Sequence, residues 1–355
     1  MHRRFIQTPV SQFLLFCNNT KINFSLICIS VIFTSHYTYA SNASKSDINN
    51  SSINNISDSV NVLDEQRYTG SLLSPSGAIT KAGILALEPY LQSTISRGAY
   101  QSDGSVKNSK HRTDSADSFL LIKYAITDNL TIQATPQVNY AWNGKTTSSS
   151  VHISDLPVEF QYRWIDQDNA HYRPSFTTFL GMNFPTGNFD QLNRSLDAFG
   201  SGQYTLRFGL HSQAAYKIFH RAIRFRWWGV GRKPIGHRNI KGISNYGTDQ
   251  GFAGTVRGGL FGNAGFSFEF GITKAWVFAF DFQYDWAQGT HIKGNYNHQR
   301  YLRHITGASH DFQIAPGIEY NFTPAVGLIA GAALTVDGHN TNDFIQPQCA
   351  VNIVF

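Results

Sequence analysis

Hydrophobic and polar residues alternate along much of this chain with a period of two. The clearest stretch runs from Trp276 to Trp286, where six aromatic residues occupy every second position and mostly small or polar residues fill the others. Successive side chains of a β-strand point to opposite faces of a sheet, so such a strand has one aromatic and one largely polar face. The same alternation is present over residues 132–142, 156–164 and 312–322. The pattern predicts an all-β fold.

About twelve segments follow this pattern, and most exceed the roughly 9–11 residues that cross a bilayer at a tilt. The predicted strands cover residues 83–96, 116–127, 130–142, 152–164, 173–184, 203–216, 221–231, 257–270, 275–288, 309–322, 325–337 and 345–355.

The connections between these segments mostly alternate between short and long. The short ones include 127–129, 271–274 and 323–324. The long ones are 97–115, 143–151, 185–202, 232–256 and 289–308. Short periplasmic turns and long external loops are typical of outer-membrane barrels. Two connections depart from this alternation. The connection at 165–172 should be a short turn but is longer, and the one at 338–344 should be a long loop but is short.

These patterns predict a transmembrane antiparallel up-and-down β-barrel of about 12 strands with both termini in the periplasm. In lipid every backbone N–H and C=O needs an internal partner, and closing the sheet removes its unpaired edges. The apolar faces would then contact lipid and the polar faces would enclose a lumen. A secreted soluble β-protein is the alternative. Its aromatic faces would form a core instead.

Aromatic residues gather near the ends of the apolar faces, as expected where an apolar band meets two water interfaces. We expect a lipid-facing girdle formed by Tyr140, Trp142, Trp164, Trp276 and Trp286.

The first forty residues have the features of an export signal. Arg3, Arg4 and Lys21 precede an apolar run at 22–33, and the sequence Thr-Tyr-Ala that ends at residue 40 suits a signal-peptidase site. The run is too short for a spanning helix, and a buried N-terminal helix is the less favoured alternative. We therefore predict a signal peptide at 1–40 and export to the outer membrane of a Gram-negative bacterium.

Residues 41–66 contain 13 Ser or Asn among 26 positions and are predicted to be a disordered linker. The barrel is then expected to occupy residues 67–355.

Charged residues make up 15% of the chain, against about 25% in typical globular proteins. Removing residues 1–40 lowers Lys+Arg from 29 to 26 and leaves Asp+Glu at 23, so the net charge falls from +6 to +3.

A net charge this small gives little support to nucleic-acid binding, and no nucleic-acid partner is expected.

Only Cys349 remains after residue 40, so an internal disulfide is impossible. The sequence contains no CxxC motif, and we expect neither a metal site nor a cofactor.

The chain ends in a short alternating strand in which Val351, Ile353 and Phe355 share one face. This end resembles the closing strand of bacterial outer-membrane proteins. The resemblance implies that Phe355 is a signal read by the barrel-assembly machinery.

Short motifs point to a family. They are GSLLSP at 70–75, KAG at 81–83, EPY at 88–90, NFPTG at 183–187 and GSG at 200–202. Together they resemble the MetA-pathway of phenol degradation family over most of residues 68–355. The resemblance implies an outer-membrane transporter for aromatic or other apolar small molecules. It carries over no catalytic residues.

Alternation along the strands also predicts which charged side chains line the lumen. This set comprises Glu88, Lys123, Glu159, Arg163, Arg207, His211, Arg224, Arg226, Glu269, Asp281, Asp285, Asp311 and Glu319. Walls of mixed charge could screen permeants. The favoured interpretation is an internal salt-bridge network that stiffens or blocks the barrel. Glu88 and His211 are accordingly expected to be structural rather than substrate-binding.

The favoured function is an outer-membrane channel for small, aromatic or apolar molecules. One alternative is a barrel with a plugged lumen whose loops act in adhesion. A lipid-modifying enzyme is less favoured, because the sequence lacks GxSxG and HExxH motifs, and we expect no catalytic residues.

The predicted loop at 289–310 is rich in basic residues and histidines, namely His291, Lys293, His298, Arg300, Arg303, His304 and His310. It could bind a metal ion or anionic lipopolysaccharide, although a solvated basic loop is the favoured interpretation. The expected partners are outer-membrane lipid and lipopolysaccharide, the barrel-assembly machinery and a small-molecule permeant.

Overall fold

The computed structural model describes residues 62–75, 77, 81–108, 112–169, 171–297 and 300–355. The predicted signal peptide and most of the predicted linker lie outside these residues. Everything below concerns the compact unit Asp58–Phe355.

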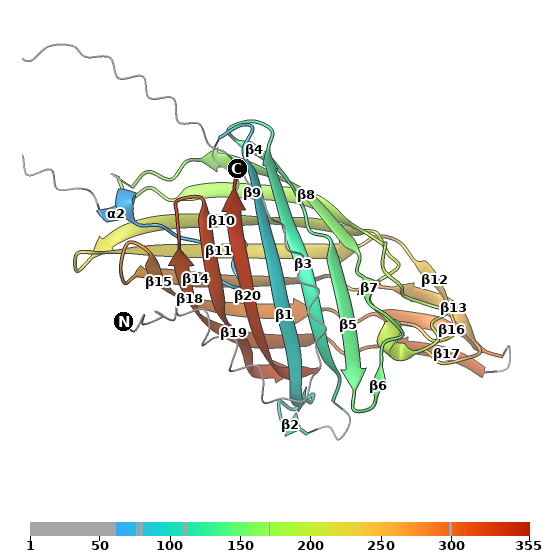
Figure 1. Ribbon diagram of the computed structural model, residues 1–355. Coiled ribbons are helices and arrows are strands. Elements are labelled where there is room, and N and C mark those ends of the chain that lie inside the picture. Colours follow the sequence, from blue (N-terminus) through green and yellow to red (C-terminus); the bar gives the residue numbers. More distant parts are fainter. Residues whose placement is uncertain (1–61, 76, 78–80, 109–111, 170, 298–299) are drawn as a thin grey trace, which may run out of the picture. The chain divides into compact units, whose positions relative to one another are not determined.

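A single antiparallel sheet closes on itself to form a barrel (Figure 1). Strand β1 (Leu85–Tyr100) pairs on one side with β20 (Thr341–Val354) and on the other with β3 (Asp114–Ala125). The wall continues through β4 (Leu130–Ala134) with β5 (Gln137–Asn143), β8 (Leu156–Ile165), β9 (Ser175–Phe184), β10 (Thr205–Ile218), β11 (Arg221–Pro234), β14 (Phe261–Gly271), β15 (Trp276–Ala287), β18 (Ser309–Asn321) and β19 (Val326–His339).

Strands β4 and β5 run along the same partner, β3, and act as one strand interrupted at Thr135 and Pro136. Proline has no N–H to donate to the ladder, which explains the break. The wall therefore has twelve strands, and the predicted all-β barrel of about 12 strands is confirmed.

The two rims of the barrel differ in their connections. The ends of β1 and β20 at Leu85 and Val354 lie at one rim, which we call the terminal rim. Short connections at 126–129, 219–220, 272–275 and 322–325 lie at the same rim. The opposite rim, the loop rim, carries the long connections at 101–113, 144–155, 185–204, 235–260 and 288–308. No helix among the described residues is long and apolar enough to cross a membrane.

Burial along the wall is the reverse of that in a soluble protein. Outward-facing Leu180, Phe160 and Phe266 are 59%, 50% and 49% exposed, whereas the carboxylates of Glu269 and Glu319 are fully buried. An apolar exterior is stable only against an apolar solvent. The barrel is therefore built to face lipid.

A second antiparallel sheet of four strands lies beyond the loop rim (Figure 1). It consists of β12 (Arg238–Lys241), β13 (Phe252–Arg257), β16 (His291–Tyr296) and β17 (Arg300–Ile305), and we call it the external sheet. The prediction of plain loops at 232–256 and 289–308 was wrong. Ile240, Phe252, Val256 and Ile292 form a core for this sheet, but each short strand supplies too few alternating positions to be seen in the sequence.

The remaining external connections contain β2 (Val106–Lys107), β6 (Thr146–Thr147), β7 (His152–Ile153) and the 3-10 helix η1 (Ser195–Asp197).

Part of the predicted linker is structured. Helix α2 (Val62–Glu65) lies within it, and Leu63 packs against Ala215 and Ala222 of the wall. The first wall strand begins at Leu85, two residues after the predicted start at residue 83. Before it, Leu72 packs inside the barrel instead of joining its sheet.

Candidate functional site: the barrel lumen

The lumen contains charged side chains from most strands of the wall. Ten of the thirteen residues predicted to line it are buried, namely Glu88, Lys123, Glu159, Arg163, His211, Arg226, Glu269, Asp281, Asp311 and Glu319. The other three, Arg207, Arg224 and Asp285, are partly buried. Burying this many charges requires compensation by ion pairs and hydrogen bonds.

One compensating cluster lies in the half of the lumen next to the terminal rim. Glu269 accepts hydrogen bonds from Arg224 through both carboxylate oxygens, and the one from Nη2 measures 2.6 Å. The Nε atom of Arg226 lies 3.2 Å from the same carboxylate. The guanidinium of Arg224 also stacks over the ring of Tyr68, 4.0 Å from its centroid. This cluster holds two cations around one buried anion.

A stretch of chain before β1 enters this half of the lumen. We call residues 66–75 and 77 the lumen segment. At its start, the side-chain amide of Gln66 donates to the carbonyl of Thr273 in a terminal-rim turn, at 3.0 Å. Further on, Gly83 donates to the carbonyl of Ala125 at the same rim, at 2.9 Å. The chain thus enters and leaves through the terminal rim.

Carboxylates of the wall accept hydrogen bonds from the backbone of the lumen segment. Glu319 accepts from the N–H groups of Thr69 and Gly70, at 2.6 and 3.3 Å. Asp281 accepts from the N–H of Leu72 at 3.0 Å. Lys123 donates to the carbonyl of Gly77 at 2.8 Å. Backbone that belongs to no helix or strand needs such partners at membrane depth. We call the wall residues that contact the lumen segment, here Glu319, Asp281 and Lys123, its seat.

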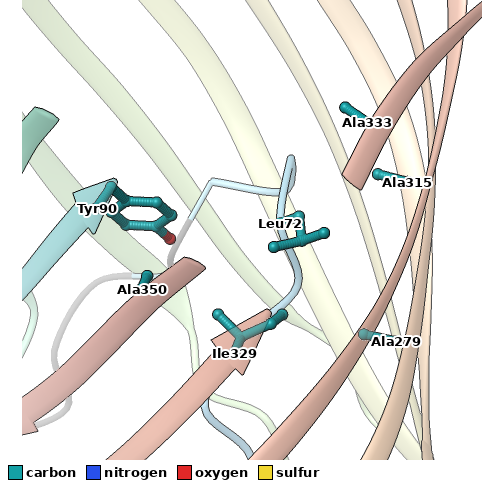
Figure 2. Packing of buried hydrophobic residues seen from close by; sticks show 7 residues of the cluster. All are labelled: Leu72, Tyr90, Ala279, Ala315, Ile329, Ala333 and Ala350. Carbon is teal, nitrogen blue, oxygen red and sulfur yellow. The ribbon is translucent and has the colours of Figure 1, made fainter. Parts of the chain in front are cut away.

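The apolar part of this seat is made of small residues. Leu72 packs among Ala279, Ala315, Ile329, Ala333 and Ala350, with Tyr90 nearby (Figure 2). A Cβ atom added at Gly331 would lie 2.6 Å from the Cδ1 atom of Leu72, and one added at Gly317 would lie 3.2 Å from it. The small inward side chains of β15, β18 and β19 therefore leave the room that Leu72 occupies.

A second polar cluster lies across the barrel on β4, β8 and β10. Glu159 pairs with Arg207 at 3.2 Å and accepts from the side-chain amide of Gln133 at 3.1 Å. Gln161 donates to Gln133 at 3.0 Å. His211 is buried nearby on β10, where a Cβ added at Gly77 would lie 3.5 Å from its ring. Among the described residues, no group of His, Cys, Asp and Glu could hold a metal ion.

The half of the lumen next to the loop rim contains a cavity of about 460 Å³. Its walls come from the ends of β11, β14, β15 and β18, and include Arg232, Phe261, Asn263, Asp285 and Asp311. The guanidinium of Arg232 lies 5.8 Å from the centroid of the Phe261 ring. Small-molecule sites have volumes of roughly 300–1,000 Å³ and combine apolar surface with a few polar groups. We call this space the lumen cavity.

The acidic residues of the lumen cavity are held by amides rather than by cations. Asp285 accepts from Gln283 at 2.6 Å and from Gln313 at 3.0 Å. Asp311 accepts from Gln313 at 2.7 Å and from the hydroxyl of Thr341 at 3.0 Å. Among the described residues, neither carboxylate forms an ion pair with Arg232. A polar permeant would therefore meet both signs of charge here.

The structure places Arg163 at the terminal rim rather than deep in the lumen. Arg163 forms an ion pair with Asp166 and donates to the carbonyl of Asp128 at 2.6 Å. The side-chain amide of Asn129 donates in turn to the carbonyl of Arg163 at 3.1 Å. These bonds hold the turn between β3 and β4, so Arg163 organises the rim.

The predicted girdle residues lie near strand ends and form aromatic pairs. Trp164 packs edge-on against Tyr162 and Trp276 packs against Tyr320, each with ring centroids 4.6 Å apart. Tyr140 and Trp142 are 6.3 Å apart. Trp286 covers Gly262, where an added Cβ would lie 2.9 Å from its ring.

At the chain's end, the backbone N–H of Phe355 donates to the carbonyl of Leu85 at 2.8 Å, and its side chain is exposed. Recognition of Phe355 by the assembly machinery stays a prediction.

Sequence reasoning missed Arg232 and Phe261 as lumen residues. The predicted strand stopped at residue 231, one position before Arg232, although the alternation continues to the end of β11 at Pro234. Phe261 shares the inward face with Asn263 and pairs with Arg232 across the ladder. Extending the period of two by one residue would have found Arg232. Phe261 lay within the predicted strand 257–270 and was missed because the predicted lumen set contained only charged residues and one histidine.

No family model and no curated protein matches the sequence. Among solved structures, the chain resembles an outer-membrane channel from Pseudomonas putida F1 with a TM-score of 0.58 and 13% identity, over 80% of this chain and 100% of that one. The NanC porin matches with a TM-score of 0.38 and 12% identity, over 75% of this chain and 98% of that one. A mutant of the monoaromatic hydrocarbon channel TodX gives 0.39 and 12%, over 77% and 90%.

The similarity to the Pseudomonas channel concerns the fold. Together with the apolar exterior of the barrel, it places the protein in the bacterial outer membrane.

Proposed function

We propose that this protein is an outer-membrane channel for small aromatic molecules, and that the lumen cavity binds the permeant on its way through the barrel. The observation that carries the proposal is the cavity itself, about 460 Å³ of free space inside a lipid-facing barrel. It offers the ring of Phe261 beside the guanidinium of Arg232 and the carboxylates of Asp285 and Asp311.

The chemistry of the lining supports an aromatic permeant that carries a polar group. Phe261 provides a ring surface on which another ring can stack. Arg232 can bind an oxygen substituent through its guanidinium, which presents several donors in one plane. The motif resemblance to the MetA-pathway of phenol degradation family points to the same class of molecule. That family membership is part of this proposal.

In this proposal the channel is closed while the lumen segment lies in its seat. This segment lies inside the terminal half of the lumen, and in this proposal permeation requires the segment to shift within its seat or to leave it. Its backbone is held by a few carboxylates and by one buried leucine, Leu72, and it forms no strand with the wall. A segment held in this way can move without unpairing the barrel.

Liposome swelling tests the proposal directly. Liposomes containing the purified protein are expected to take up benzoate about fivefold faster than glucose, because the flat aromatic anion can stack on Phe261 and form an ion pair with Arg232, whereas glucose carries no charge. Replacing Phe261→Ala should reduce benzoate uptake about fivefold and leave glucose uptake unchanged. The matched control is Phe322→Ala, which removes an exposed phenylalanine at the opposite rim and should change neither rate.

A second candidate function is favoured by the filled terminal half of the lumen. It is a non-conducting barrel whose external loops bind a surface partner. Deleting residues 67–77 separates the two candidates, because the channel should then conduct more strongly. A deletion variant that migrates as a folded barrel and still passes neither benzoate nor glucose would support the non-conducting barrel instead.

A further inference from the structure

One face of the external sheet carries a cluster of cations in register. Arg257 on β13 lies directly opposite His291 on β16, and Lys293 on β16 lies opposite Arg303 on β17. Directly opposed residues on one face have Cβ atoms only about 4.5–5.5 Å apart, and like charges there destabilise a sheet. An anion bound on this face would therefore relieve the repulsion between these side chains.

None of the described carboxylates pairs with the basic residues of this face. The four strands of the external sheet contain no aspartate or glutamate. Within the described part of the chain, no ion pair joins Arg257, Lys293 or Arg303 to a carboxylate. In the lumen, by contrast, Arg224 and Arg226 share the carboxylate of Glu269.

A small cavity of about 80 Å³ lies on this basic face, lined by His237, Thr255, Arg257, His291 and Lys293. A cavity of this size has room for a small group such as a single oxyanion. An arginine, a lysine and a hydroxyl around one space are the groups that commonly bind phosphate.

The basic face points away from the lumen. A Cβ atom added at Gly258 would lie 2.7 Å from Pro234 and 3.5 Å from the buried side chain of Gln203, so position 258 faces inward. The adjacent Arg257 therefore faces outward, while Val256 lies in the sheet's core with Phe189 packed against it.

The height of the basic face above the membrane follows from the strands that continue into it. His291 comes four residues after Ala287, the end of β15, and therefore at most roughly 13 Å beyond it at about 3.3 Å per residue. Trp286, of the predicted girdle, immediately precedes Ala287. The headgroup layer adds only about 5–7 Å to each side of the hydrocarbon core. His291 and the directly opposed Arg257 thus lie at or just above the headgroups of the outer leaflet, and Lys293 is two residues further along β16.

We propose that this basic face binds the phosphate groups of lipopolysaccharide in the surrounding outer leaflet. Its charge, its oxyanion-sized cavity, its outward direction and its height all fit a phosphate-bearing glycolipid. Exposed Tyr301 and Ile305 lie on the same face and offer surface to the sugar rings or acyl chains beside the phosphates. The site is separate from the lumen and does not depend on what the channel passes.

The test is a binding titration of the purified full-length protein in detergent with bisphosphorylated lipid A, monophosphoryl lipid A and inorganic phosphate. The double variant Arg257→Gln with Lys293→Gln should bind bisphosphorylated lipid A about tenfold more weakly than wild type. The matched control, Lys107→Gln with Lys145→Gln, removes two exposed cations from other external connections and should stay within about twofold of wild type. Unheated migration in SDS checks that each barrel is folded.

Three results would overturn the proposal. Equal losses in the two double variants would show a nonspecific response to net charge. Equal binding of the two lipid A forms by wild type would show that the phosphates are not recognised. Displacement of lipid A by millimolar inorganic phosphate would assign the cavity to the free ion. If the double variant does not fold, the single variant Arg303→Gln replaces it, and an affinity equal to that of wild type contradicts the proposal.

Discussion

The two halves of the lumen are built from the same alternating strands but differ in what fills them. In the terminal half, Ala279, Ala315 and Gly331 make the inward surface small, and a stretch of the chain itself occupies the space. In the loop half, Arg232 and Phe261 project inward and about 460 Å³ stays free. Alternation decides which side chains face inward. Their size and charge then decide whether the lumen receives a piece of chain or keeps a cavity.

Charge compensation follows the same division. Glu269 is fully buried and shared by two arginines, so its removal leaves the buried Arg226 and the partly buried Arg224 without their shared carboxylate. Asp285 is only partly buried and is held by neutral amides. The terminal half is thus a tightly coupled structural unit, whereas the acidic groups of the loop half are held by neutral hydrogen-bond donors.

The largest effect is expected from Glu269→Gln. Removing one partner from a buried ion pair typically costs about 3–5 kcal/mol. Urea unfolding in detergent, followed by tryptophan fluorescence, should show a loss in the free energy of unfolding of this size. The matched variant Asp285→Asn should lose less than about 1 kcal/mol, because its hydrogen bonds come from neutral donors. Equal losses would mean that the two halves of the lumen do not differ in charge compensation.

A smaller effect, confined to the lumen segment, is expected from Leu72→Ala. Leucine-to-alanine changes in packed cores cost about 2–5 kcal/mol, and the low end applies here because the segment can relax toward the rest of the lumen. Amide hydrogen exchange should become faster at Thr69 and Leu72, whose N–H groups are bound by Glu319 and Asp281. Exchange in the wall strands should not change.

Leu180→Ala is the matched control for this variant, because it removes a leucine from the exposed outer face of the wall. Unchanged exchange in Leu72→Ala would contradict the role of Leu72 as the anchor of the lumen segment.

The wall could be predicted from sequence because the alternation of hydrophobic and polar residues is visible within each strand by itself. The predicted strands at 275–288 and 309–322 differ by one residue at most from β15 and β18 at each end. The seat of the lumen segment could not be found in this way. The hydrogen bond between Thr69 and Glu319 joins residues 250 positions apart, and no period in residues 66–77 marks the segment as buried.

The external sheet escaped prediction for a different reason. Strand β12 has only four residues, and Ile240 is its single buried position. A period of two cannot be recognised from one position. The basic residues of β16 and β17 also suggested a solvated loop, because in sequence a cationic sheet face and a cationic loop have the same composition.

The smallest effect is expected at the loop rim, where polar contacts join external connections. Asp197 accepts hydrogen bonds from the backbone N–H of Ser149 at 2.7 Å and from the ring of His152 at 3.0 Å. Burial alone would raise the pKa of Asp197, but the hydrogen bonds from Ser149 and His152 outweigh burial and lower it below the ordinary aspartate value. The folded state therefore favours the ionised carboxylate.

The ionised Asp197 stabilises the folded loops fully at pH values above about 3.9, the ordinary pKa of an unfolded aspartate. This stabilisation is lost as the pH falls from there through the lower pKa that Asp197 has in the folded protein. Wild-type protein should thus lose protease resistance of the 185–204 connection as the pH is lowered below about 4. In Asp197→Asn that connection should be cleaved faster at neutral pH, with little further change on acidification. The wall and the lumen segment should not respond to Asp197→Asn at neutral pH, because their contacts are separate from those of the loop rim. An equal acid response in Asp197→Asn and wild type would place the titrating group elsewhere in the external connections.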